Sequence, residues 1–451
     1  MGQRQAPSVH RAVREDDEFP TTGRMSNATG RLEQARIHSP ARRTPLSGGL
    51  RRLAPAHDRR AVARGDTRRD LACERARRSI VSPATYFSAP ISGRSRRLPT
   101  MQRCFCVTGH SLALTRIERP MPVPTGRQVL VRVTGAGVCH SDIHIWEGQY
   151  NLGGGKSLQL KDRGMKLPLT MGHEIAGTIT SAGPQAGDVA LGASVVVFPW
   201  LGCGQCATCQ RGDENLCLSG RSLGVYQDGG YADYVLVPDV KYCVDITGLD
   251  PAEAAPLACS GVTTYSALKK FGPAILDTPV VVMGAGGLGH MALQMMKAMG
   301  AKGAIVVDID PVKRDAALKA GALKAIDGSA ADAAQQLIEA TGGGARMVLD
   351  LVGGEPTVNL ALACATRGTD IVIVGLYGGE LKISIPFFPL RPLAIRGSYV
   401  GNLQDLKDLV AFAKSGKLQP VQVSRRPLEE ANEALMSLKA GKVVGRVVLV
   451  P

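Results

Sequence analysis

The sequence predicts an α/β protein with a β-rich domain, a doubly wound parallel sheet covered by helices, and a disordered segment ahead of both. Three observations support this prediction. The first 100 residues differ in composition from the rest of the chain, residues 101 to about 255 contain short valine-rich runs broken by glycine and proline, and residues from about 256 to 396 alternate apolar runs with helical stretches. The chain therefore combines one unfolded segment with two kinds of folded structure.

Residues 1–100 are rich in arginine and poor in aromatic side chains. They hold 21 Arg, no Lys and 9 acidic residues, whereas the rest of the chain holds 33 basic and 30 acidic residues. Neither a helical nor a strand period runs through this segment, so we expect it to be disordered. It could be a nucleic-acid-binding arm, a targeting peptide, or a region outside the working protein. The acidic stretch REDDEF argues against a transit peptide, and the scarcity of aromatics argues against base stacking. We therefore favour a functional protein that starts at or near Met101, without a nucleic-acid partner.

Hydropathy and cysteine usage bear on the location of the protein. The chain has no apolar run of about 18 or more residues and no signal-peptide pattern. We therefore expect a soluble, cytoplasmic protein with no membrane partner. Eleven cysteines in such a chain indicate metal ligands or reactive thiols rather than a disulfide framework.

The patterning after Met101 changes along the chain. Runs such as QVLVRVTGAGV and GASVVVFPW predict a domain of short β-strands. The runs PVVVMGAG, GAIVVDID, ARMVLDLVG and DIVIVGL, with amphipathic segments between them, predict a parallel sheet with helices on both faces. From about residue 397 the chain returns to mixed structure, with a helix at LQDLKDLVAFAKSG and a strand at GRVVLVP.

Four cysteines lie in one short loop with the spacing C-x2-C-x2-C-x7-C. Such spacing lets thiolates converge on one ion, and four of them fill the tetrahedral shell that zinc prefers. A filled shell leaves no position for water or substrate, so this zinc is expected to be structural. An iron–sulfur centre and unliganded thiols are the alternatives, and the first lacks a supporting cofactor pattern. The four residues are Cys203, Cys206, Cys209 and Cys217.

A second metal site is indicated by GVCHSDIH and the following GHE, which contain Cys139 and His173. A catalytic zinc needs three protein ligands and keeps a fourth position open. Cys259, in LACSGVTTY, stands where the β-rich domain meets the parallel sheet. A third ligand there would put the metal in the cleft between the two domains.

A glycine-rich turn follows the first strand of the parallel sheet. Its G-x-G-x-x-G pattern stands between a strand and a helix, the context in which such glycines let backbone N–H groups approach a pyrophosphate. Asp308 ends the next strand, 19 residues beyond Gly289, where its carboxylate can accept from ribose hydroxyls and repel a 2′-phosphate. The pattern therefore favours NAD over NADP. The turn consists of Gly284, Gly286, Gly287, Leu288 and Gly289.

Together these motifs resemble those of the zinc-containing alcohol dehydrogenases of the medium-chain dehydrogenase/reductase family, over residues 101–451. The resemblance implies a GroES-like catalytic domain at 101–257 and 397–451, interrupted by a Rossmann domain at 258–396. It also implies a catalytic zinc, a structural zinc and NAD, with reversible oxidation of an alcohol to an aldehyde or ketone. Family members are commonly dimers or tetramers, so we expect a homo-oligomer.

The resemblance implies roles for the metal-site residues. Cys139, His173 and Cys259 match the ligands of the catalytic zinc, and the four-cysteine loop matches the structural zinc. Glu174 matches a residue that approaches the metal during ligand exchange, and Asp142 matches a carboxylate that orients the ligand histidine.

Other residues match the proton path, the cofactor site and the substrate pocket. Ser141 matches the hydroxyl that accepts the alcohol proton, and His144 matches the imidazole that passes it towards solvent. Lys313 matches a lysine near the adenosine. Arg446 matches an arginine near the pyrophosphate, although a solvated surface charge fits it nearly as well. Trp200 resembles a pocket-lining residue, and a core tryptophan is the alternative.

Two other functions remain open from the sequence. A polyol dehydrogenase of the same family would use the same zinc with a more polar pocket. A nucleic-acid-binding protein would use the arginine-rich arm, but it leaves the glycine turn and Asp308 unexplained. The segment 147–170 is long and rich in glycine and charge, and it could form a flap or a subunit contact.

Overall fold

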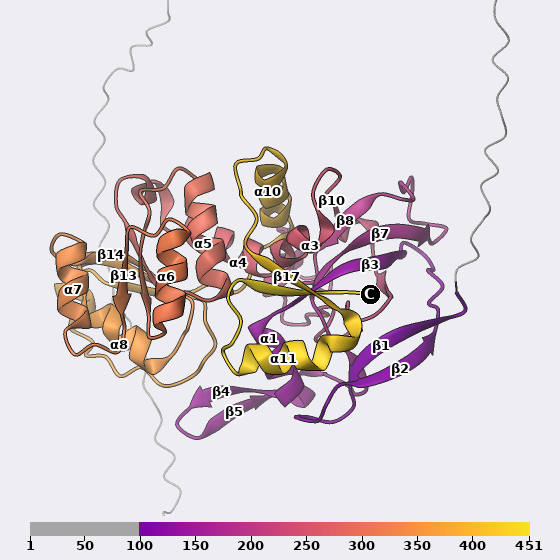
Figure 1. Cartoon of the computed structure of the whole chain (residues 1–451), viewed down its shortest axis with the longest axis horizontal. Helices are drawn as coiled ribbons and strands as arrows, with labels where there is room; N and C mark the ends of the chain where they lie inside the picture. The colour runs from indigo at the N-terminus through magenta and orange to yellow at the C-terminus, as the bar shows by residue number, and fades with distance from the viewer. Residues whose placement is uncertain (1–98) are drawn as a thin grey trace, which may run out of the picture. The chain divides into compact units, whose positions relative to one another are not determined.

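The computed structural model describes residues 99–451, so the predictions made for the arginine-rich segment lie outside the described residues. The first strand begins at Met101, where the composition of the chain becomes ordinary. Among residues 99–451, no helix has both the length and the apolar character needed to cross a bilayer. The predicted fold class is confirmed by a β-rich part and a parallel sheet with helices (Figure 1).

The β-rich part contains a three-stranded sheet and a seven-stranded sheet. The smaller one has the order β2-β1-β6, and the larger one has the order β10-β8-β7-β3-β18-β17, with β9 also paired to β3. The C-terminal strand β18 pairs antiparallel with β3, so the end of the chain returns to the domain in which the fold starts. The strands are β1 (Met101–Val107), β2 (Thr115–Pro120), β3 (Val129–Val138), β6 (Leu169–Thr170), β7 (Glu174–Ala182), β8 (Ser194–Val197), β9 (Tyr234–Val237), β10 (Cys243–Asp245), β17 (Val423–Pro427) and β18 (Arg446–Val450).

The parallel sheet has six strands, and every pair of neighbouring strands in it is parallel. Its order is β13-β12-β11-β14-β15-β16, which places the change of direction between β11 and β14, where such folds bind ligands. The strands are β11 (Val280–Met283), β12 (Ala304–Asp308), β13 (Lys324–Asp327), β14 (Ala345–Asp350), β15 (Ala365–Ile373) and β16 (Ala394–Gly397). Their connecting helices include α5 (Gly287–Ala298), α6 (Pro311–Lys319), α7 (Ala333–Ala340) and α8 (Glu355–Ala363).

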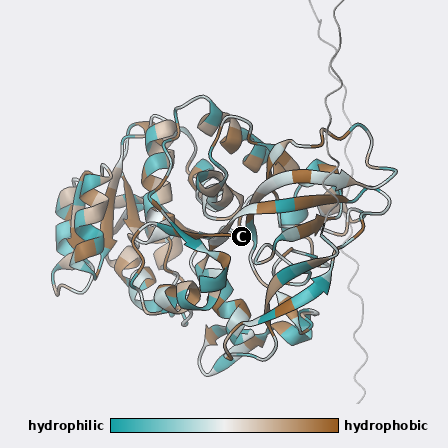
Figure 2. Cartoon of the chain, turned by 45° about the vertical axis from the view of Figure 1, so that its right-hand side comes forward, coloured by the Kyte–Doolittle hydropathy of each residue, from teal (hydrophilic) through white to brown (hydrophobic). Residues whose placement is uncertain are grey.

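Both faces of the parallel sheet are covered. Val280 and Val282 of β11 belong to the same apolar cluster as Met291 of α5. Val281, between them, belongs to a second cluster with Leu337 of α7. Because both faces are buried, the strand is apolar at every position rather than at alternate ones. Figure 2 shows the same division in the helices, whose ribbons alternate between hydrophobic and hydrophilic stretches.

The remaining helices connect these sheets. The α-helices are α1 (His140–Glu147), α2 (Ala207–Gln210), α3 (Pro251–Ala254), α4 (Ser260–Lys269), α9 (Phe387–Leu390), α10 (Leu403–Lys414) and α11 (Ala431–Lys439). The 3-10 helices are η1 (Leu160–Arg163), η2 (Glu214–Leu216), η3 (Val240–Tyr242), η4 (Ala255–Ala258), η5 (Gly272–Leu276) and η6 (Leu428–Glu430). The predicted C-terminal helix is α10, and it begins with a capping box because the side chain of Asn402 accepts from the N–H of Asp405 at 2.9 Å.

The glycine- and charge-rich segment after α1 forms a hairpin of two short strands, β4 (Gln149–Gly153) and β5 (Lys156–Gln159). Its tip packs against the loop that follows β15 in the parallel-sheet domain. A Cβ on Gly153 would lie 2.5 Å from the carbonyl carbon of Gly379, and Nζ of Lys156 lies 3.9 Å from a carboxylate oxygen of Glu380. The hairpin therefore connects the two domains at a point that is separate in sequence from the two places where the chain passes from one domain to the other.

Candidate functional site

Three segments bring four potential metal ligands together. Ligand atoms of Cys139, His173, Glu174 and Cys259 all lie within 4.8 Å of one another, and all four residues are buried. Cys139 follows β3 and is the N-cap of α1, and Cys259 is the N-cap of α4. His173 and Glu174 lie at the start of β7, which pairs with β3. The sheet thus brings residues distant in sequence to one point.

Asp142 connects this cluster to the surrounding backbone. Its Oδ2 accepts from the N–H of Cys139 at 2.8 Å and from the hydroxyl of Tyr231 at 3.0 Å. Its Oδ1 lies 3.0 Å from Nδ1 of His173, and both side chains are fully buried. A carboxylate in this position favours the imidazole form that carries its proton on Nδ1 and leaves Nε2 free to bind a metal.

The charges of the cluster fit a cation. Hydrogen bonding to Cys259 lowers the pKa of Cys139 well below its usual value, and the same pairing raises the pKa of Cys259. Burial lowers the pKa of His173, but the charges of Asp142 and Cys139 outweigh burial and raise it. Nε2 of His173 and Oε2 of Glu174 are buried without a hydrogen-bond partner. Two thiols, an imidazole and a carboxylate with unpartnered atoms form a donor set suited to zinc.

Arg446 lies between the cluster and the glycine-rich turn. It is buried and forms an ion pair with Glu174, so it is not the solvated surface charge that the sequence left open. Burial raises the pKa of Glu174 to about 7, against the opposing effect of Arg446. The side chain of Arg446 also approaches Gly287 of the glycine-rich turn. A Cβ added to Gly287 would lie 2.7 Å from Cδ of Arg446.

Ser141 and His144 lie in α1, one helical turn apart and next to Cys139. The helix cap is Cys139 and not Ser141, which rules out the structural role that a serine at this point would ordinarily have. The ring of His144 lies 5.6 Å from the ring of the exposed His140 and 4.9 Å from that of Tyr150. Burial, followed by the charge of His140, lowers the pKa of His144, so its imidazole is neutral near pH 7.

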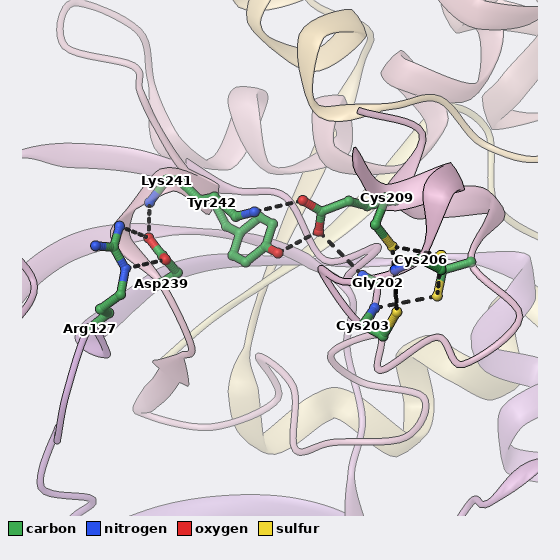
Figure 3. Close-up of polar contacts among 10 residues, drawn as sticks. Arg127, Gly202, Cys203, Cys206, Cys209, Asp239, Lys241 and Tyr242 are labelled. Carbon is green, nitrogen blue, oxygen red and sulfur yellow. Dashed lines mark hydrogen bonds and ion pairs between the residues drawn. The ribbon is translucent and has the colours of Figure 1, made fainter. Parts of the chain in front are cut away.

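The four-cysteine loop forms a second cluster with all its sulfur atoms close together (Figure 3). The N–H of Cys206 donates to Sγ of Cys203 at 3.4 Å, and the N–H of Cys203 donates to Sγ of Cys217 at 3.3 Å. Hydrogen bonds from the backbone of Gln205 and Cys206 lower the pKa of Cys203 to about 6. A thiolate is therefore favoured here before any cation binds.

Glu214 ties the loop to the β-rich domain. Its carboxylate accepts from the hydroxyl of Tyr242, from Nζ of Lys241 at 2.6 Å and from the N–H of Gly202 at 3.4 Å. Burial raises the pKa of Glu214, but the hydrogen bonds from Lys241 and Tyr242 outweigh burial and keep the pKa below its usual value. Figure 3 shows this network continuing through Lys241 to Asp239 and Arg127.

The glycine-rich turn has the shape that a dinucleotide requires. Gly284 has φ +99°, and a Cβ on Gly289 would lie 2.3 Å from the carbonyl oxygen of Gly284, so both positions require glycine. A Cβ on Gly286 would meet nothing within 4 Å, so open space adjoins the turn at the N-terminus of α5. Leu288 lies in the first turn of that helix.

Asp308 is joined to the glycine-rich turn. Its Oδ2 accepts from the N–H of Ala285 at 2.7 Å, and its Oδ1 accepts from the N–H of Asp310 at 2.9 Å. Asp310 caps α6, because its Oδ1 accepts from the N–H of Val312 at 2.9 Å. Nζ of Lys313 lies 3.8 Å from the carboxylate of Asp310, so the structure pairs it with that residue.

Trp200 is both a buried residue and a neighbour of the metal-ligand cluster. Its Nε1 donates to the carbonyl of Ala258 at 3.0 Å, and its ring lies 5.3 Å from that of His173. Sequence reasoning missed three residues near the cluster, namely Tyr150, Tyr231 and Tyr399. Tyr150 lies in the segment that the sequence singled out by its length, whereas the other two carry no signal in the sequence that could have identified them.

Comparisons with known proteins agree with this arrangement. Residues 125–248 match the family model described as an alcohol dehydrogenase GroES-like domain, and residues 287–415 match that of a zinc-binding dehydrogenase. An NAD-dependent alcohol dehydrogenase of Sulfurisphaera tokodaii is 42% identical over 74% of this chain and 95% of its own length. The crystal structure of the alcohol dehydrogenase of Aeropyrum pernix aligns with a TM-score of 0.71 and 31% identity over 77% of this chain and 100% of its own. A cobalt- and zinc-bound alcohol dehydrogenase of Pyrobaculum aerophilum aligns with a TM-score of 0.67 and 26% identity, over 78% of this chain and all of the other.

Proposed function

The chain belongs to the zinc-binding alcohol dehydrogenase family, and on that premise we propose that it oxidises alcohols reversibly to aldehydes or ketones with NAD. The main support is the buried cluster of Cys139, His173 and Cys259, in which Nε2 of His173 has no hydrogen-bond partner. A catalytic domain of residues 101–257 and 397–451, interrupted by a nucleotide-binding domain of residues 258–396, would carry out this reaction.

We assign the metal ligands as follows. Cys139, His173 and Cys259 would hold the catalytic zinc, and the unpartnered Oε2 of Glu174 would be available as a fourth donor. When bound, this zinc would favour loss of the proton from an alcohol by stabilising the negative charge left on its oxygen. The four-cysteine loop, held to the domain by Glu214, would carry the structural zinc.

The proton path follows one face of α1. The hydroxyl of Ser141 takes the proton of the alcohol as it gives up its own, and the imidazole of His144, one helical turn further on, accepts the proton that Ser141 releases. His144 can do so because its lowered pKa keeps it neutral. The exposed His140, whose ring lies 5.6 Å away, then connects His144 with solvent.

The cofactor position follows from the glycine-rich turn. The pyrophosphate of NAD would occupy the open space beside Gly286, at the N-terminus of α5, with Arg446 close by to offset its charge. Asp308 would accept from the ribose hydroxyls. We assign Lys313 to the adenosine end, and its pairing with Asp310 keeps its charge beside that position.

We also propose that the protein is a cytoplasmic homo-oligomer. None of the ten cysteines among residues 99–451 forms a disulfide, which fits a reducing compartment. Among the described residues β16 pairs only with β15, so its other edge is open, and large apolar side chains in the segment that connects β15 to β16 are exposed. They are Leu376, Tyr377, Leu381, Ile385, Phe387 and Leu390.

Light scattering tests the oligomer with a matched pair of variants. Ile385 is 80% exposed in the segment that connects β15 to β16, and Val123 is 79% exposed in the β-rich domain. Ile385→Lys should lower the mass towards that of the monomer, whereas Val123→Lys should leave it unchanged. A parent protein with monomer mass would contradict the proposal.

The catalytic proposal is tested by formation of NADH from aliphatic, aromatic and polyol alcohols, before and after removal of zinc. Turnover should disappear on chelation and in Cys139→Ser, and it should persist in Cys243→Ser, which alters a cysteine outside both clusters. Turnover confined to polyols would support the polyol dehydrogenase instead. Bound zinc and NAD without turnover of any alcohol would leave the fold correct and the function wrong.

A further inference from the structure

Aromatic side chains gather around the catalytic cluster although the chain contains few of them. The sequence holds 2 Trp, 9 Tyr and 8 Phe among 451 residues. The ring of Trp200 lies 5.3 Å from that of His173, and the ring of Tyr399 lies edge-on to Trp200 at 6.0 Å. The ring of Tyr150 lies 4.9 Å from that of His144. Three distant segments therefore bring aromatic rings to one site, and we call Tyr150, Trp200 and Tyr399 the aromatic wall.

The tyrosines of the aromatic wall lie near the two candidate thiolate ligands. Burial, and then the charges of Tyr399, Tyr226 and Cys139, raise the pKa of Tyr150. Partial burial, and then Tyr226 and Cys259, raise the pKa of Tyr399 to about 12. Both phenols are therefore neutral at physiological pH and present uncharged rings. Tyr399 is 52% exposed, so its ring is open to solvent on part of its surface.

Two members of the aromatic wall are held in place by contacts unrelated to a ligand. The hydrogen bond from Nε1 of Trp200 to the carbonyl of Ala258 fixes its ring beside Cys259. Tyr150 lies on β4, in the hairpin whose tip packs on Gly379 of the other domain. Fixed rings lose little conformational freedom when a ligand arrives, so they recognise a flat partner at low cost.

We infer that the substrate is an alcohol whose carbinol carbon carries an aryl ring, with the corresponding aryl aldehyde or ketone as product. This inference rests on the proposed function and narrows its substrate class. A planar ring can stack on or pack edge-to-face against the aromatic wall, whereas a saturated ring of the same size gains only burial. A polyol would instead have to give up water from several hydroxyl groups beside apolar ring faces.

The test compares two alcohols that differ in the planarity of one ring. We expect kcat/KM for benzyl alcohol to exceed that for cyclohexylmethanol at least about tenfold. Tyr399→Leu should reduce this ratio several-fold, chiefly through benzyl alcohol, and Trp200→Leu should reduce it further. Phe412→Leu is the control, because it removes a ring that packs on Tyr265 outside the aromatic wall and should leave the ratio unchanged.

Binding of the two alcohols to the zinc-loaded protein without NAD, measured by calorimetry, separates this inference from the proposed function. Tighter binding of benzyl alcohol that weakens in Tyr399→Leu supports the aromatic wall even if neither alcohol is oxidised. Equal binding, or a ratio that Tyr399→Leu and Phe412→Leu change alike, overturns the inference while leaving the dehydrogenase proposal intact.

Discussion

Replacing Asp142 by asparagine should weaken zinc binding without removing any ligand. Oδ2 of Asp142 accepts from two donors, the N–H of Cys139 and the hydroxyl of Tyr231. The atom that faces these two donors in Asp142→Asn must therefore remain an oxygen, because an amide nitrogen cannot accept from them. The amide nitrogen is left to face His173.

That nitrogen would face Nδ1 of His173, which lies 3.0 Å from the other carboxylate oxygen of Asp142. An N–H in that position needs an acceptor, so Nδ1 gives up its proton and Nε2 takes one. A protonated Nε2 cannot bind a metal, so zinc binding must supply the free energy that returns the imidazole to its other tautomer. The free energy of zinc binding becomes less favourable by the free-energy difference between the two tautomers.

The expected loss is 10- to 100-fold in zinc affinity, about 1.4–2.7 kcal/mol, the range for residues that orient a metal-bound histidine. Zinc per chain is measured by elemental analysis after dialysis against a series of zinc buffers, in which the four-cysteine loop contributes a constant background. Asp370→Asn is the control, because Asp370 pairs with Arg396 in the parallel sheet, away from both cysteine clusters. Superimposable occupancy curves for Asp142→Asn and the parent would refute the tautomer argument.

Three further predictions use single substitutions. Gly153→Ala should raise KM for the alcohol several-fold in steady-state assays, because the added Cβ would collide with Gly379 and disturb the hairpin that carries Tyr150. Gly155→Ala is the control and should leave KM unchanged, because Gly155 has a similar positive φ but a Cβ there would meet nothing within 4 Å. Gly289→Ala should destabilise the fold by about 1–3 kcal/mol in thermal unfolding, and Gly286→Ala should mainly weaken NAD binding in a titration. Glu214→Gln should be less stable than the parent at pH 7, and denaturant unfolding at several pH values should show this difference shrinking as pH falls. The sign follows because a pKa lowered by folding contributes stability above the unfolded value, and this stability is lost as pH falls through the folded pKa.

Sequence reasoning succeeded where the signal is local. The parallel sheet followed from continuous apolar runs, because a strand buried on both faces must be apolar at every position. The glycine-rich turn was visible because its strand, glycines and helix are adjacent in the chain. The four-cysteine loop was visible because its spacing alone lets the thiolates converge.

Contacts between distant segments were not predictable in the same way. Tyr399 lies directly after β16, where the chain leaves the parallel sheet, and its ring packs edge-on to Trp200 of the β-rich domain. No period or spacing connects these two residues, because only the tertiary fold brings them together. The same holds for the hairpin, for which the sequence left a flap or a subunit contact open, whereas in the fold Gly153 packs closely against Gly379.

Arg446 shows why burial decides a role that sequence leaves open. From the sequence a surface charge fits it nearly as well as a contact with the pyrophosphate, because a strand-initial arginine has no distinguishing neighbours. A buried guanidinium needs a partner, and the partner here is Glu174 of the catalytic cluster, while its methylene groups approach Gly287 of the nucleotide turn. A single side chain therefore contacts both the metal site and the cofactor site, so binding of a charged group at one site changes the electrostatic potential at the other.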